Sequence, residues 1–153
     1  MSIDERVQTH TALHVLKGAA RRVIGTRWTA SVYVEERHGR LTLNCERQPS
    51  EEEIHRIETL ANEKIRSNSA IEELKLDRVE AERRWGDEIY DLFPIPANIT
   101  RLSILHIPEW NVNACKEAHT KSTGEVGRLR VGKPRYRAAK QLLELPFDLV
   151  HET

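Results

Sequence analysis

Residues 10–24 read HTALHVLKGAARRVI, a stretch that predicts the first helix of the fold. Apolar side chains recur at steps of three and four residues, the spacing of one helix face, at Leu13, Leu16, Ala20 and Val23. Thr9 is a candidate N-cap, and Gly25 is suited to ending the helix. His10 and His14 are four residues apart, so they are expected to project from the same face of this helix.

A hairpin and a second helix are predicted next. Residues 31–34 and 41–43 alternate as strands do, with His38-Gly39 as the predicted tight turn between them. Three glutamates follow Ser50 at positions where the helix dipole favours negative charge, so a helix is predicted from there to about residue 67. Its inward-facing residues are Ile54, Ile57, Leu60, Ala61 and Ile65.

The second half of the chain is rich in predicted strands. They are expected at about 71–76, 102–107, 126–131, 134–137 and 142–150, with a short charged helix at 77–84. Helices mixed with hairpins predict an α+β fold in which the helices pack on a largely antiparallel sheet. The length of 153 residues and the lack of a visible linker or repeat indicate one domain spanning residues 1–153.

The composition describes a hydrophilic globular protein. Hydrophobic residues make up 39% of the chain and charged residues 31%. No apolar run approaches the ~20 residues that cross a bilayer, and the N-terminus lacks an apolar signal region, so a cytoplasmic protein is expected. Lysine plus arginine equal aspartate plus glutamate at 24 each, so any contact with nucleic acid must come from a local basic patch.

The histidine pair does not fit a zinc protease. In the H-E-x-x-H motif the glutamate acts as general base, whereas the corresponding residue here is Thr11, which cannot accept that proton. Cys115 and His119 repeat the four-residue spacing with a thiolate and an imidazole. They can share a metal only if a turn or a helical segment brings them together, because four residues of extended strand span about 13 Å.

Three imidazoles and one thiolate form a borderline-soft ligand set that favours zinc over magnesium or calcium. The candidate ligands are His10, His14, Cys115 and His119. Their spacing does not distinguish a closed structural site from a catalytic site with an open coordination position. The remaining histidines, which are His38, His55, His106 and His151, are interpreted as ordinary surface or structural residues. Cys45 is predicted to be a small core residue.

Three segments together resemble a known family. HTALHVLKGA at 10–19, LANEKIRSN at 60–68 and NVNACKEAHTKSTGEVG at 111–127 resemble the editing domain of alanyl-tRNA synthetase and its free-standing relatives, the AlaX proteins. The likeness runs from about residue 8 to about residue 148, and the early position of the histidine pair is similar to the short AlaX type. The editing domain of threonyl-tRNA synthetase shares the four candidate ligands, so these residues alone do not identify the amino acid.

The resemblance implies hydrolysis in trans of the ester in seryl-tRNA(Ala), with glycyl-tRNA(Ala) as a second substrate. A synthetase pocket for alanine rejects an added hydroxyl poorly, so a second site must remove the product. Family likeness assigns the recognition of serine to Thr29 after Trp28, and pocket-shaping contacts to Thr120, Thr123 and Gly124. Zinc would either activate a water or hold the substrate α-amino group, with His119 as the looser ligand.

Binding of the tRNA acceptor end requires local positive charge. The candidate residues, which cluster beside the second ligand motif, are Arg128, Arg130, Lys133, Arg135, Arg137 and Lys140. Lys17, Arg21 and Arg22 add positive charge along the first helix. Two alternatives stay open: an RNA-binding domain with a structural zinc, and a threonyl-type editing domain that acts on another mischarged tRNA.

Overall fold

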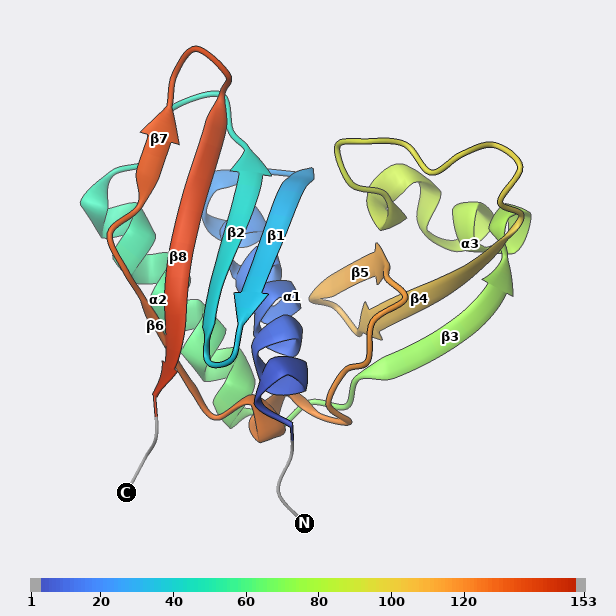
Figure 1. The fold of residues 1–153 in the computed structure, drawn as a ribbon, viewed down its shortest axis with the longest axis horizontal. Coiled ribbons are helices and arrows are strands. Elements are labelled where there is room, and N and C mark those ends of the chain that lie inside the picture. Colours follow the sequence, from blue (N-terminus) through green and yellow to red (C-terminus); the bar gives the residue numbers. More distant parts are fainter. Residues whose placement is uncertain (1–3, 151–153) are drawn as a thin grey trace.

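Two long helices lie side by side on one face of an antiparallel sheet. The computed structural model describes residues 4–150, so His151 lies outside the described part of the chain. The two helices are α1, Glu5–Ile24, and α2, Glu51–Arg66, and both lie behind the sheet in Figure 1. Within residues 4–150, no helix is both long enough and apolar enough to cross a membrane.

The first helix begins earlier than predicted. Asp4, not Thr9, is its N-cap, because the Asp4 carboxylate accepts hydrogen bonds from the backbone N–H groups of Arg6 and Val7. Thr9 instead lies buried within the helix. The predicted end is confirmed, since Gly25 adopts the left-handed conformation with φ of 71°.

The first sheet has the strand order β1-β2-β8-β6, with β7 also paired to β8, and every pairing is antiparallel. Its strands are β1 Thr29–Glu35, β2 His38–Asn44, β6 Arg128–Val131, β7 Arg135–Arg137 and β8 Leu142–Val150. The predicted turn at His38-Gly39 is wrong, because both residues belong to β2 and the turn is formed by residues 36–37. Gly39 is required where it lies, since a Cβ there would come within 2.4 Å of the Phe147 ring.

The main core lies between the two helices and this sheet. It is built from alternate residues of the strands and from the inward faces of both helices, including Leu13, Leu16, Leu41, Leu43, Ile57, Ala61, Leu143, Leu145 and Phe147. The predicted start of α2 is confirmed, because Ser50 and Glu53 form a reciprocal capping box. Cys45, predicted to be a core residue, is 5% exposed and belongs to this core.

The remaining strands form a separate second sheet with the order β3-β4-β5. Its elements are β3 Glu72–Asp77, β4 Arg101–Ile107 and β5 Asn111–Ala114, with helix α3 Arg78–Trp85 and the 3-10 helix η1 Gly86–Ile89. A smaller core, which includes Ala81, Ile89 and Ile104, lies between α3, η1 and this sheet. The α+β class and the antiparallel pairing are as predicted, but the strands are divided between two sheets.

Helix α1 joins the two sheets. Figure 1 shows the first sheet on one side of it and β5 on the other. The Trp110 indole N–H donates to Val15 O at 2.9 Å, and the Asn111 amide donates to His14 O at 3.2 Å. Gly18 permits this close approach, since a Cβ there would lie 2.2 Å from the Trp110 indole nitrogen. The candidate site lies along this contact between α1 and β5.

Candidate metal centre

The four predicted ligands meet in one place. His10, His14, Cys115 and His119 each offer a ligand atom, and these atoms all lie within 4.8 Å of one another. The three imidazole centroids form a nearly equilateral triangle with sides of 5.2, 5.1 and 5.1 Å. His10 Nε2 lies 3.1 Å from Cys115 Sγ. The fold therefore brings together two pairs of residues that are more than 100 positions apart in the sequence.

The segment that carries His119 is an irregular loop. Cys115 directly follows β5, and its backbone N–H extends the ladder by donating to Ser103 O at 2.8 Å. The loop then returns to α1, where the Thr120 N–H donates to the Thr11 hydroxyl at 3.0 Å. Thr11 occupies the position of the missing protease glutamate, and its side chain anchors the loop that presents His119.

The electrostatics of the group suit a bound cation. Burial and the proximity of His119 lower the pKa of His10 to about 4, and burial lowers the pKa of His119 to about 4. Burial, followed by the neighbouring His119, His10 and Lys17, lowers the pKa of His14 well below 6.5. All three imidazoles are therefore neutral at pH 7, which is the form that binds a metal.

Unpaired polar atoms support the same conclusion. His14 Nε2 and both ring nitrogens of His119 are buried without a hydrogen-bond partner among the described residues. Burial raises the pKa of the Cys115 thiol to about 11, so a cation is needed to hold it as the thiolate. Because buried polar atoms normally have partners, these nitrogens and the sulfur fit a divalent metal with nitrogen and sulfur preference, such as zinc.

A small cavity of about 70 Å³ adjoins three of the four candidate ligands. Its lining includes His10, His14 and Cys115 together with Thr29, Val32, Lys17, Asp91 and Asn113. Thr29 is 6% exposed and lines this cavity. A side chain with a hydroxyl group therefore lies in the same cavity as three of the candidate ligands, as substrate recognition would require.

Lys17 lines the cavity. Its predicted place on a basic surface is wrong, because the residue is only 2% exposed. Its Nζ donates to Asn113 Oδ1 at 2.7 Å and lies 3.5 Å from Asp91 Oδ1. Burial lowers the pKa of Lys17. Lys17 follows His14 by three residues, a spacing that predicts that both side chains lie on the same face of the helix. No sequence pattern predicts its contact with Asp91.

Two predicted pocket residues lie elsewhere. The Thr123 hydroxyl, which is completely buried, donates to Lys64 O at 2.8 Å and accepts from the Ser69 N–H at 2.9 Å. Gly124 lies beside Asn68 in a different groove at the end of α2. Neither residue lines the cavity beside the four ligands. Their part in substrate binding stays a prediction.

The predicted tRNA-binding residues are exposed on the opposite edge of the first sheet. They are Arg128 and Arg130 on β6, Lys133 in the following loop, and Arg135 on β7. The cavity residues Thr29 and Val32 belong to β1 at the other edge. Three strand spacings separate the two edges, which is about 14 Å. Only a large ligand can contact both regions.

Of the other histidines, three agree with the interpretation as surface or structural residues. His38 Nδ1 lies 3.0 Å from Asp148 Oδ1, and His106 Nδ1 lies 2.7 Å from Glu72 Oε1. His55 is exposed on α2.

Fold and site together define an α+β structure with a partly buried group of three histidines and one cysteine beside a cavity. No protein-family model matches the chain. The chain is similar to a segment of alanine–tRNA ligases. It is 40% identical over 130 residues to that of Methanopyrus kandleri, 36% over 131 to that of Korarchaeum cryptofilum and 39% over 123 to that of Hyperthermus butylicus.

These matches cover 80 to 85% of the chain but only 13 to 14% of each ligase. The chain thus spans about one seventh of the length of these relatives. The predicted resemblance to alanyl-tRNA synthetase is confirmed, and a match confined to one segment is consistent with an AlaX-like editing domain.

Proposed function

We propose that the protein is a zinc-dependent deacylase that hydrolyses mischarged seryl-tRNA(Ala) in trans, with glycyl-tRNA(Ala) as a second substrate. One observation carries the proposal: in a chain similar to alanine–tRNA ligases, three members of the candidate ligand group border a small cavity that Thr29 also lines. The partner is then the acceptor end of tRNA(Ala), and the site of action is the cytoplasm, where tRNA is charged.

The chain's own residues supply the metal site. His10, His14 and Cys115 would hold the zinc as neutral imidazoles and a thiolate, and His119 would complete the set or interact more loosely. When bound, zinc supplies a positive charge that either activates a water for attack on the ester or holds the substrate α-amino group. The buried walls restrict access of bulk water to the ester, which strengthens these electrostatic interactions.

Selection of serine would depend on the size and polarity of the cavity. A volume of about 70 Å³ suits only a small side chain. The Thr29 hydroxyl would pair with the serine hydroxyl, and an alanine in its place would leave Thr29 unpaired at a cost of about 1–3 kcal/mol. Lys17, fixed by Asn113 and Asp91, would define one wall of this cavity.

The basic residues at the far edge of the first sheet would contact the tRNA backbone. Arg128, Arg130, Lys133 and Arg135 are exposed and each is free to approach a phosphate. Such contacts make binding sensitive to salt. Thr123 and Gly124 would contribute indirectly, by supporting the loop between His119 and β6.

Deacylation assays test the proposal directly. The intact protein is incubated with seryl-, glycyl- and alanyl-tRNA(Ala), and with seryl-tRNA(Thr). We expect rapid loss of seryl-tRNA(Ala), slower loss of glycyl-tRNA(Ala), and stable alanyl-tRNA(Ala). Equal loss of seryl- and alanyl-tRNA(Ala) would exclude proofreading, and a preference for seryl-tRNA(Thr) would support the threonyl-type alternative.

Zinc removal tests the other alternative, an RNA-binding domain with structural zinc. The cavity beside the ligands favours a catalytic site, since structural zinc sites are closed. Chelation is therefore expected to abolish deacylation while the circular dichroism spectrum is retained. Unfolding on chelation would indicate a structural metal.

A further inference from the structure

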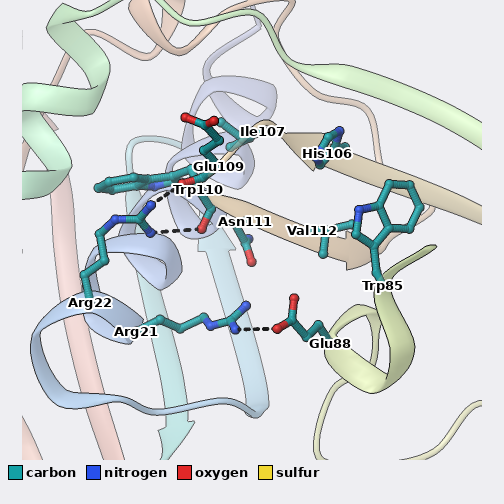
Figure 2. A pocket seen from close by; sticks show the side chains of 10 residues that line it. All are labelled: Arg21, Arg22, Trp85, Glu88, His106, Ile107, Glu109, Trp110, Asn111 and Val112. Atoms are coloured by element: carbon teal, nitrogen blue, oxygen red, sulfur yellow. Dashed lines mark hydrogen bonds and ion pairs between the residues drawn. The ribbon is translucent and has the colours of Figure 1, made fainter. Parts of the chain in front are cut away.

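A larger groove lies farther along the contact between α1 and β5. We call it the α1–β5 groove; it has a volume of about 430 Å³. Figure 2 shows the side chains that line it, which come from the last turn of α1, from α3 and η1, and from β4 and β5 with their connecting turn: Arg21, Arg22, Trp85, Glu88, His106, Ile107, Glu109, Trp110, Asn111 and Val112. None of these residues belongs to the metal centre or its cavity.

The groove has an aromatic side chain on each of two opposite walls. Figure 2 shows Trp110 on the α1 side and Trp85 on the other, with Asn111 and Val112 between them. The guanidinium of Arg22 lies 4.2 Å from the centroid of the Trp110 ring, and the Lys64 ammonium lies 5.3 Å from it. A planar ligand in this groove would meet indole rings and guanidinium planes, the surfaces on which unpaired bases stack.

Positive charge lines the α1 wall. Arg21 reaches across the groove to Glu88 at 3.3 Å, and Arg22 donates to the backbone carbonyls of Glu109 and Trp110. Both arginines therefore have N–H groups fixed at the rim. An exposed ion pair such as Arg21–Glu88 is weak, so a phosphate group can compete for Arg21 at little cost.

Asn111 supplies a specific hydrogen-bonding position. It is 4% exposed, and its Nδ2 donates to His14 O at 3.2 Å, which fixes the orientation of the amide. Its Oδ1 is buried and has no partner among the described residues. Such an atom is unusual because buried acceptors are normally paired. A ligand that inserts an N–H donor would satisfy it.

We propose that the α1–β5 groove binds a nucleotide of unpaired RNA whose base carries its amino group at C4 of a pyrimidine or C6 of a purine, that is, cytosine or adenine, because uracil and guanine carry a carbonyl oxygen at these positions. The amino group of either base is a donor that matches Asn111 Oδ1, whereas the equivalent atom of uracil is an acceptor. The base stacks on the Trp85 indole, and its phosphate pairs with Arg21.

The position of the groove relates it to the metal centre. Seven residues of α1 separate His14 from Arg21, which is about 10 Å along the helix. Four residues of β5 separate Cys115 from Asn111, which is about 13 Å along the strand. A few nucleotides of single strand span this distance. That the strand is the segment preceding the reacting 3′ adenosine rests on the proposed function, whereas nucleotide binding by the groove does not.

The test compares the RNA trinucleotides CCC and UUU by NMR titration of the intact chain. The three indole N–H signals report on location, because Trp85 and Trp110 line the groove and Trp28 lies outside it. We expect CCC to shift the Trp85 signal, to leave that of Trp28 unchanged, and to bind about five- to tenfold more tightly than UUU, the worth of one hydrogen bond.

Three variants show whether the groove residues are responsible for trinucleotide binding. Asn111→Leu should remove the preference for CCC, and Arg21→Gln, a milder change at the rim, should weaken both trinucleotides about three- to tenfold. The matched control is Arg101→Gln, an exposed arginine outside the groove that should bind as the unaltered chain does. If Asn111→Leu fails to fold, the comparison of CCC with UUU and the Arg21→Gln variant decide the question.

Equal affinity for CCC and UUU in the unaltered chain would overturn the proposal. So would a preference that survives Asn111→Leu, or an Arg21→Gln variant that binds like Arg101→Gln. The outcome is independent of catalysis, because Cys115→Ala should bind CCC unchanged. A preference for CCC in a protein that deacylates nothing would refute the proposed function and leave the groove assignment intact.

Discussion

Thr11→Val is expected to weaken metal binding without removing any ligand. The hydroxyl of Thr11, which is completely buried, donates to Val7 O at 2.8 Å and accepts from the Thr120 N–H at 3.0 Å. Valine has nearly the same shape but no acceptor. The substitution therefore releases the loop that carries His119 from α1.

The magnitude follows from the bond that is lost. Thr120 is 3% exposed, so its N–H would be buried without a partner, which costs about 1–3 kcal/mol. In a domain of this size each kcal/mol lowers Tm by about 2–4 °C. Loss of an outer contact that positions a ligand typically reduces metal affinity about 10- to 100-fold. We expect a zinc affinity near the lower end of that range, because three ligands stay in position.

Competition with a chromophoric chelator measures the zinc affinity, and thermal unfolding with and without zinc measures stability. Thr9→Val is the matched control. Thr9 is equally buried on the same helix, but its hydroxyl lies within donating distance of two other carbonyls, 2.9 Å from Glu5 O and 2.5 Å from Glu36 O, and does not contact the loop. It should lose stability and keep its zinc affinity. Unchanged zinc affinity in Thr11→Val, or an equal loss in both variants, would refute this account of the loop.

Three further predictions concern the same site. Thr29→Val should slow the deacylation of seryl-tRNA(Ala) about tenfold and that of glycyl-tRNA(Ala) much less, because only serine loses a hydrogen bond; equal slowing in time courses would exclude Thr29 from serine recognition. Cys115→Ala should lose zinc binding, measured by metal content after dialysis, and retain a cooperative melt, whereas loss of that melt would indicate a structural metal. The metal-free protein should lose stability below pH 6.5. The pKa of His10 and of His119 is about 4 in the fold, so between pH 6.5 and 4 the unfolded chain binds protons that the folded chain does not. Urea unfolding at pH 7.5 and pH 5 measures this effect, and equal or greater stability at pH 5 would contradict it.

Local sequence patterns were sufficient to predict most helices and strands. The apolar periodicity of α1 and the glutamates after Ser50 identified the two long helices, because both signals act within one or two turns. The wrong predictions concern features that depend on contacts between segments far apart in the sequence. Gly39 reads as a turn residue, but contact with Phe147 in β8 requires a glycine within the strand. Likewise, nothing local determined that the strands would divide into two sheets.

The candidate ligands were also predictable, whereas their surroundings were not. Spacing and ligand chemistry identified His10, His14, Cys115 and His119 as a possible zinc set, and the family resemblance agreed. Lysine side chains are almost always exposed in folded proteins, so an exposed position is expected for Lys17. It is buried because Asn113 and Asp91, from β5 and the segment after η1, provide its partners.

The sequence by itself determined the α+β class, the helical spacing of the first histidine pair and the identity of the four candidate ligands. These properties depend on backbone periodicity and side-chain chemistry, which neighbouring residues specify. The tertiary structure alone decided that two pairs more than 100 residues apart lie together, with their ligand atoms within 4.8 Å of one another. It also decided that Thr11 anchors the loop, that Thr29 faces a small cavity, and that Asn111 keeps an unpaired oxygen at the groove. These features depend on how α1 packs against β5, and such packing is set by contacts between distant segments.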